Sequence, residues 1–192
     1  MRAPEPGPDT GGAATSAITG DYTIDPAHSR LGFSTRHAVV TKVTGHFTSY
    51  AGTAHVDVER PDRSSVELSI DADSVATGWG DRDDYLRDHA FFGGDGATLT
   101  FSSTAVDRAG TDWTITGDLT MKGVTRSIDL VFTQADAARD PEGRVRIGFT
   151  GSLVVNRSDW GLNFATALET GGVLVSEKVT LTLEVSAVQG DG

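Results

Sequence analysis

The chain of 192 residues contains no cysteine, so it has no disulfide, no thiolate nucleophile and no Cys-ligated zinc or iron–sulfur centre. It is also short of positive charge, because 16 Lys and Arg against 27 Asp and Glu leave a formal net charge of −11. Neutralising the phosphates of a nucleic acid needs clustered cations, which an acidic chain of this kind does not supply. Nucleic acid is therefore not an expected partner.

Long hydrophobic runs are missing as well. No window approaches the roughly 18 uncharged apolar residues of a membrane helix, so no stable membrane insertion is expected. Residues 1–20 are rich in Pro, Gly and small residues, and Arg2 is followed by Pro, Glu and Asp rather than by the apolar run of a secretory signal. We predict a disordered tail over residues 1–20, one globular domain over 21–190, and a cytoplasmic location.

From Asp21 onward the hydrophobic residues alternate with polar ones, the spacing of strands with one buried face. The clearest case is Trp113 to Met121, where Trp113, Ile115, Leu119 and Met121 share one face with Gly117. The same alternation occurs in further segments, at residues 30–37, 65–70, 98–105, 124–132, 145–155 and 173–185. These patterns predict a series of antiparallel strands.

Short connections with Pro, Gly or Asp separate the strands, for example Arg60-Pro61-Asp62 and Met121-Lys122-Gly123. Two longer segments differ. Within Thr77 to Gly96, Tyr85, Leu86 and His89 recur at helical spacing, which predicts a short helix. The segment Ser158 to Gly172 is glycine-containing but carries Trp160 and Phe164, so it suits either a lid or a dimer contact.

Strands with one apolar face bury it either in a sandwich of two sheets or in one closed barrel, and periodicity alone does not choose between them. An ordered set of segments resembles the YceI-like family, also described as polyisoprenoid-binding proteins, from about Tyr22 to Val188. The segments are Ile24-Asp25-Pro26-Ala27-His28-Ser29, Gly32-Phe33, Arg36-His37, Gly45-His46-Phe47, Arg82-Asp83, Leu86, Phe91-Phe92, Leu99-Thr100-Phe101-Ser102-Ser103, Gly117-Asp118-Leu119-Thr120-Met121-Lys122-Gly123-Val124-Thr125-Arg126 and Asn156-Arg157-Ser158-Asp159-Trp160-Gly161-Leu162.

The resemblance implies an all-β fold, an extended antiparallel lipocalin-like β-barrel of about eight strands with a short inserted helix. It also implies that the barrel holds a long amphiphile, such as a polyisoprenoid or an isoprenoid quinone. A binder of this kind needs a dry channel with a few polar donors at its mouth. The expected channel residues are Phe33, Phe47, Phe101, Ile115, Leu119, Phe132, Phe149, Leu153, Leu162 and Phe164. Each of them could equally fill the core of a barrel that holds no ligand.

An anionic or quinone headgroup would seek cationic or His donors. The nominees are Arg36, His37, Arg82, Arg126 and Arg157. For each arginine, a solvated surface position or a structural pair with a nearby carboxylate is an equally good interpretation. His37 shares a face with Leu31 and Phe33, so a hydrogen-bonded place in the wall is a competing role for it.

Sequence patterns of enzymes are scarce. The five histidines lack the spacing of a metal motif, and no Gly-x-Ser-x-Gly segment occurs. We therefore expect a non-enzymatic barrel that binds, stores or transports a lipid, with no cofactor and a possible homodimer. Two alternatives stay open at this point. One is an enzyme acting on such a ligand with His37 as acid or base, and the other is a barrel with a filled core that serves in assembly.

Overall fold

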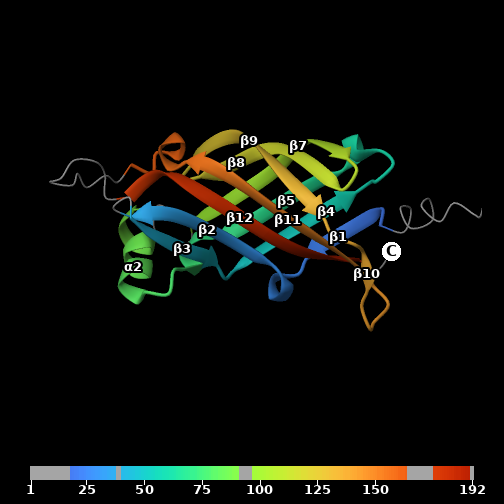
Figure 1. Cartoon of the computed structure of the whole chain (residues 1–192), viewed down its shortest axis with the longest axis horizontal. Helices are drawn as coiled ribbons and strands as arrows, with labels where there is room; N and C mark the ends of the chain where they lie inside the picture. The colour runs from blue at the N-terminus through green and yellow to red at the C-terminus, as the bar shows by residue number, and fades with distance from the viewer. Residues whose placement is uncertain (1–17, 38–39, 91–96, 164–174, 191–192) are drawn as a thin grey trace, which may run out of the picture.

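The computed structural model of the chain describes residues 18–37, 40–90, 97–163 and 175–190. Over these residues the protein is an elongated antiparallel β-barrel with a short helix at one end (Figure 1). The all-β, barrel-shaped fold with an inserted helix is therefore confirmed.

The strands are β1 (Gly20–Ile24), β2 (Arg30–His37), β3 (Thr41–Phe47), β4 (Tyr50–Val56), β5 (Ser65–Asp71), β6 (Val75–Ala76), β7 (Thr98–Ala109), β8 (Asp112–Met121), β9 (Val124–Gln134), β10 (Ala138–Arg139), β11 (Val145–Asn156) and β12 (Val175–Gln189). The helix α2 spans Gly80–Tyr85 and continues as a wider turn, η4, over Leu86–Ala90. Single 3-10 turns occur at η1 (Pro26–His28), η2 (Pro61–Arg63), η3 (Ala72–Ser74) and η5 (Arg157–Trp160).

Eight strands close the barrel, in the order β11-β9-β8-β7-β5-β4-β1-β12, with β12 pairing back onto β11. The long strand β12 makes the closure possible, because one of its edges pairs with β11 along residues Lys178 to Val188. Its other edge pairs first with β2 and then with β1. Strands β2, β3 and β6 thus prolong the sheet beyond β12.

The barrel has two distinct ends. We call the α2 end the one that holds α2, η5, the β8–β9 turn and the chain between β2 and β3. The opposite end, which we call the η2 end, holds η2, the β7–β8 turn and the start of β1 (Figure 1). The β8–β9 turn is formed by Lys122 and Gly123 with φ of 51° and 73°, the left-handed conformations of a tight hairpin turn.

The predicted alternation is confirmed where the sequence showed it best. On β8 the residues Trp113, Ile115, Gly117, Leu119 and Met121 are all buried, and the residues between them face outward. Gly117 is required by packing, because a Cβ at this position would overlap with the ring of its neighbour Phe101. The absence of a side chain at Gly117 therefore leaves room for the ring of Phe101 in the interior.

Some expectations fall outside the described residues. They are the tail over residues 1–17, the pair Phe91-Phe92, and Phe164 with most of the segment that follows it. At the edge of the tail, Ile18 is buried and its carbonyl accepts a hydrogen bond of 2.8 Å from the Tyr22 hydroxyl. Packing of the domain thus already includes Ile18, two residues before β1 begins.

Candidate functional site

A cavity of about 160 Å³ lies inside the barrel. All eight barrel strands and the neighbouring β2 and β3 contribute to its wall, and almost all of the lining side chains are hydrocarbon or aromatic. The interior is therefore neither filled by side chains throughout nor open to water as a polar channel. An apolar cavity of this size in a protein core stays dry and has room for a small hydrocarbon group.

Several predicted channel residues line this cavity. They are Phe47, Phe101, Ile115, Leu119, Phe132 and Phe149. They come from β3, β7, β8, β9 and β11, so one interior space brings together side chains that are far apart in the sequence. The shared signal was their place on the apolar face of an alternating strand.

Other predicted channel residues lie elsewhere. Phe33 packs over Gly45 and lies 5.8 Å from Phe47 between ring centroids, outside the described lining of the cavity. Leu153 and Leu162 belong to the hydrophobic core around the cavity without lining it. Phe164 lies outside the described residues. Phe33, Leu153 and Leu162 therefore support the wall rather than form its inner surface.

The aromatic rings of the wall are arranged edge to face. The ring of Phe149 lies 6.2 Å from Trp113 at 87° and 6.4 Å from Phe132 at 78°. Such pairs are favourable beyond the area that they bury. The Trp113 indole N–H donates to the Gln134 side-chain oxygen at 2.9 Å, so the polar atom of this ring has a partner. The ring therefore lines the cavity with its apolar surface.

Two residues with polar side chains, His55 and Ser64, also border the cavity, but their polar groups bond to Asp21 and Asp57, and the sequence reasoning nominated neither. His55 Nδ1 lies 2.6 Å from Asp21 Oδ1, and Ser64 Oγ accepts from the Asp57 backbone N–H at 2.9 Å. Both lie toward the η2 end. A motif search could not have found them, because their place beside the cavity depends on how β1, β4 and β5 pair.

Arg157 is buried at the α2 end, with 4% of its surface exposed. Its guanidinium donates to the backbone carbonyls of Ser176 at 3.1 Å, Val175 at 3.2 Å and Leu162. Burial lowers the pKa of Arg157, and the Glu177 carboxylate acts in the opposite direction. Arg157 therefore joins the chain on both sides of residues 163–174, and all these hydrogen bonds go to the protein itself.

Trp160, in the same turn, completes this end of the core. Its ring is 2% exposed, and its indole N–H donates to the carbonyl of Leu119 on β8 at 2.9 Å. The turn ends at Gly161, whose φ of 71° is a left-handed conformation that glycine adopts without strain. The apolar residues of this segment thus pack inward, as far as the structure describes them.

Arg82 on α2 also serves the protein itself. Its Nε donates to the Thr77 hydroxyl oxygen at 2.7 Å and a terminal nitrogen donates to the Thr77 carbonyl at 2.9 Å. The buried Asp83 carboxylate accepts from the Thr77 backbone N–H at 2.8 Å. Together these contacts attach the start of α2 to the residue after β6, where the sheet ends.

The remaining nominees, Arg36, His37 and Arg126, are exposed at the α2 end. His37 pairs with Thr41 at the end of β2, and its ring has no hydrogen-bond partner among the described residues. Arg126 lies opposite Leu119 in the β8–β9 register, on the interior-facing side of β9. None of these side chains lines the described cavity, and no observation favours His37 as an acid or base.

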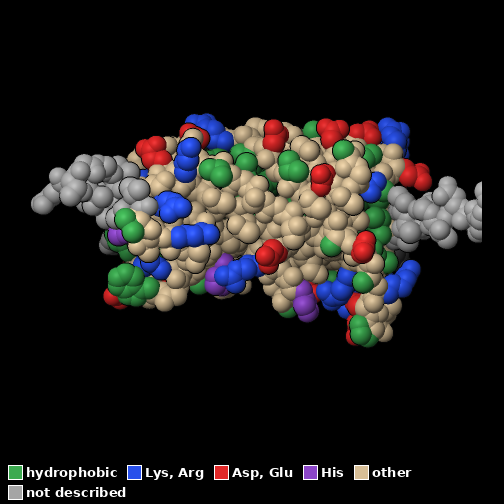
Figure 2. Space-filling model, viewed as in Figure 1, with side chains coloured by type: hydrophobic (Ala, Val, Ile, Leu, Met, Phe, Trp, Pro, Cys, Tyr) green, Lys and Arg blue, Asp and Glu red, His purple; other side chains and the backbone are tan. Residues whose placement is uncertain are grey.

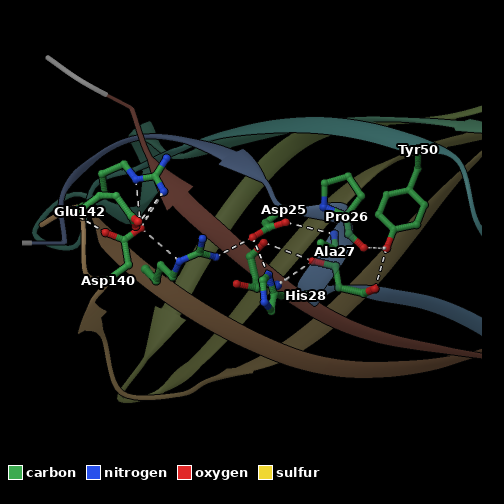
Figure 3. Close-up of polar contacts among 11 residues, drawn as sticks. Asp25, Pro26, Ala27, His28, Tyr50, Asp140 and Glu142 are labelled. Atoms are coloured by element: carbon green, nitrogen blue, oxygen red, sulfur yellow. Dashed lines mark hydrogen bonds and ion pairs between the residues drawn. The ribbon is translucent and has the colours of Figure 1, made fainter.

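A polar network that the sequence reasoning missed lies along the outside of the barrel (Figure 3). Asp25 accepts from Arg146 at 2.6 Å and from His28 at 2.8 Å, and Arg146 also contacts Asp140 at 3.4 Å. The hydrogen bonds from Arg146 and His28 lower the pKa of Asp25 to about 2. Asp25 also caps η1 by accepting from the Ala27 backbone N–H, so the network fixes the junction of β1 and β2 against β11.

The described part of the chain contains no cluster of three His, Asp or Glu side chains arranged to hold a metal ion. Among the described helices, none has the length and hydrophobicity needed to cross a lipid bilayer.

Comparison with known proteins finds relatives over most of the chain. The model of the YceI-like domain matches residues 22–187. The chain is 33% identical over 180 residues to the YceI protein of Escherichia coli, which covers 92% of this chain and 91% of that protein. It is 31% identical over 179 residues to a UPF0312 protein of Pseudomonas paraeruginosa, again covering 92% and 91% of the two chains.

Solved structures share the fold. BcnA of Burkholderia cenocepacia superposes with a TM-score of 0.71 at 22% identity, covering 85% of this chain and 98% of that one. A polyisoprenoid binding domain from Saccharophagus degradans, implicated in plant cell wall breakdown, superposes with a TM-score of 0.65 at 19% identity, covering 88% and 98%.

Proposed function

This chain belongs to the YceI-like family, and on that premise we propose that it binds a long-chain amphiphilic lipid, such as a polyisoprenoid or an isoprenoid quinone, inside its barrel without transforming it chemically. The observation that carries the proposal is the apolar cavity of about 160 Å³ enclosed by the barrel strands. The polyisoprenoid binding domain of Saccharophagus degradans, which has the same fold, adds support.

Hydrophobic burial is sufficient for such binding. Each buried methylene contributes about 0.8 kcal/mol, so a few branched five-carbon units would release on the order of 10 kcal/mol before the cost of ordering the chain. Polar groups would then set the orientation rather than the affinity. Because the present cavity suits a small hydrocarbon group, a longer chain requires the partly buried rings of Phe47 and Phe149 to move outward.

The test begins with protein purified under native conditions. Native mass spectrometry and organic extraction should detect a long-chain species, or the empty protein should take up added polyprenyl alcohol or quinone. An empty barrel that takes up neither would contradict the proposal.

A blocking variant locates the ligand. Ile115 lines the middle of the cavity from β8, so Ile115→Trp should lower uptake at least tenfold by filling the space. Thr114→Trp is the matched control, because Thr114 is the adjacent residue on the same strand and points away from the interior. Equal uptake by wild type and Ile115→Trp, with both folded by circular dichroism, would place the ligand elsewhere.

A further inference from the structure

The positive charges of this acidic protein are unevenly distributed over its surface. Strands β2 and β3, with the sequences RLGFSTRH and TKVTGHF, contain no Asp or Glu although the whole chain carries a net charge of −11. Figure 2 shows Lys and Arg side chains spread over the half of this face nearer to α2. Charge segregation of this kind creates a local positive potential on a protein that is negative overall.

Three exposed cations form the centre of this surface, which we call the β2–β3 patch: Arg36, Lys42 and Lys178. Arg36 and Lys42 are directly opposite each other in the β2–β3 register. Lys178 precedes Val179, which pairs with Thr35, and it lies near Arg36 at an irregularity in the β2–β12 register. Among the described residues, no carboxylate forms an ion pair with any of the three.

Like charges placed directly opposite each other on a sheet are destabilising, so the pair of Arg36 and Lys42 contributes nothing to folding that would explain it. The nearest carboxylate in sequence, Glu177, favours the charged form of the buried Arg157 and forms no ion pair with Arg36, Lys42 or Lys178 among the described residues. The patch is therefore arranged to meet negative charge that comes from outside the molecule.

An exposed hydrophobic residue lies beside the patch. Val40 is 82% exposed, and its backbone N–H donates to the carbonyl of His37 at 3.2 Å, which places it at the turn between β2 and β3. Turn residues are usually Gly, Asn, Asp or Pro, whereas the chain between these strands reads Ala38-Val39-Val40. A basic surface with an apolar tip matches a membrane interface, where cations meet lipid phosphates and apolar side chains enter the headgroup region.

We propose that the β2–β3 patch docks the barrel reversibly on an anionic lipid bilayer, with Arg36, Lys42 and Lys178 on the headgroups and Val40 inserted between them. This orientation brings the α2 end of the barrel against the membrane, where a water-insoluble ligand of the interior would be exchanged. The bilayer is favoured over an acidic protein because the exposed tip is apolar. The route of ligand exchange rests on the proposed function, whereas the docking itself does not.

Sedimentation with vesicles tests the proposal. The full chain should bind vesicles of phosphatidylcholine and phosphatidylglycerol at 3:1, should bind pure phosphatidylcholine vesicles at least tenfold more weakly, and should be released by high salt. Each cation of the patch that is replaced should weaken binding about fivefold. The variant Arg36→Gln/Lys42→Gln/Lys178→Gln should therefore lose most of its binding, and Val40→Ser should lose a smaller part.

The matched control is Arg60→Gln/Arg63→Gln/Arg139→Gln, which changes the net charge equally but lies away from the α2 end. An equal loss in the control, equal binding to neutral vesicles, or no binding to either vesicle would each overturn the proposal. The Ile115→Trp variant separates the two proposals, because it should bind anionic vesicles like wild type while its ligand uptake falls. Binding that falls together with uptake in this variant would contradict docking through the patch.

Discussion

Two arginines hold distant parts of the chain together, and they do so with different chemistry. Arg157 at the α2 end is 4% exposed and donates to backbone carbonyls on both sides of residues 163–174. Arg146 has 27% of its side chain exposed and lies between the carboxylates of Asp25 and Asp140. Carbonyl acceptors do not titrate, whereas carboxylates do, so the α2 end is held at any ordinary pH and the β1–β2 junction is held only while Asp25 is ionised.

The largest difference should appear on deleting the two cations. Arg157→Met leaves several buried carbonyls without a donor, which should cost about 3–5 kcal/mol of the free energy of unfolding and lower Tm by roughly 10 °C. Arg146→Met is the matched control and should shift Tm less at pH 7, because Asp25 keeps His28 and Asp140 keeps Arg144 as partners. Urea and thermal unfolding measure both, and equal shifts would show that burial does not distinguish the two sites.

A smaller effect should follow from removing one hydrogen bond at each end of the barrel. Trp160→Phe deletes the indole N–H that binds the Leu119 carbonyl, and Tyr22→Phe deletes the hydroxyl that binds the Ile18 carbonyl. Tyr22→Phe should lower the free energy of unfolding by about 1–2 kcal/mol, since the bond is buried and its acceptor stays behind. Trp160→Phe should lower it somewhat more, because it also removes buried ring volume. Chemical denaturation of the two variants measures the losses, and no change in either would mean that water replaces the lost donor.

The last difference is confined to acid. The pKa of Asp25 is about 2 in the folded protein and near 3.9 in an unfolded chain, so its ionised form stabilises the fold above pH 4 and this contribution is lost as the pH falls towards 2. The slope of unfolding free energy against pH over this range should decrease in Arg146→Gln. The slope should be unchanged in Arg157→Met. A changed slope in Arg157→Met and not in Arg146→Gln would show that Asp25 and Arg146 do not cause the acid response.

The strand faces could be read from the sequence because alternation reports burial directly. Trp113, Ile115, Leu119 and Met121 were assigned to one face, and all of them are buried. The periodicity does not predict closure into a barrel, since closure depends on β12 pairing with both β11 and β1. The resemblance to a known family supplied that choice.

The polar residues were harder to interpret for a physical reason. Arg157 donates to backbone carbonyls, and every residue type has a backbone carbonyl. The sequence therefore does not indicate which residues Arg157 contacts. Arg146 meets Asp25 across 121 positions of sequence, so no local motif connects them. Of the nominated headgroup residues, Arg82 and Arg157 are bound within the protein, and Arg36 becomes part of a basic surface only through the register that places Lys42 opposite it.

The strand β12, fifteen residues at the C-terminal side of the domain, has a further consequence for synthesis of the protein. It leaves the ribosome after β1, β2 and β11, and each of these strands has an edge that stays unpaired until β12 is made. The other seven barrel strands must therefore be made before the barrel can close, and the closing contacts between β1 and β12 join residues far apart in the sequence. Until β12 pairs, the edges of β1, β2 and β11 are exposed and can associate with strands of other chains. Chaperones that shield these edges would raise the yield of folded protein.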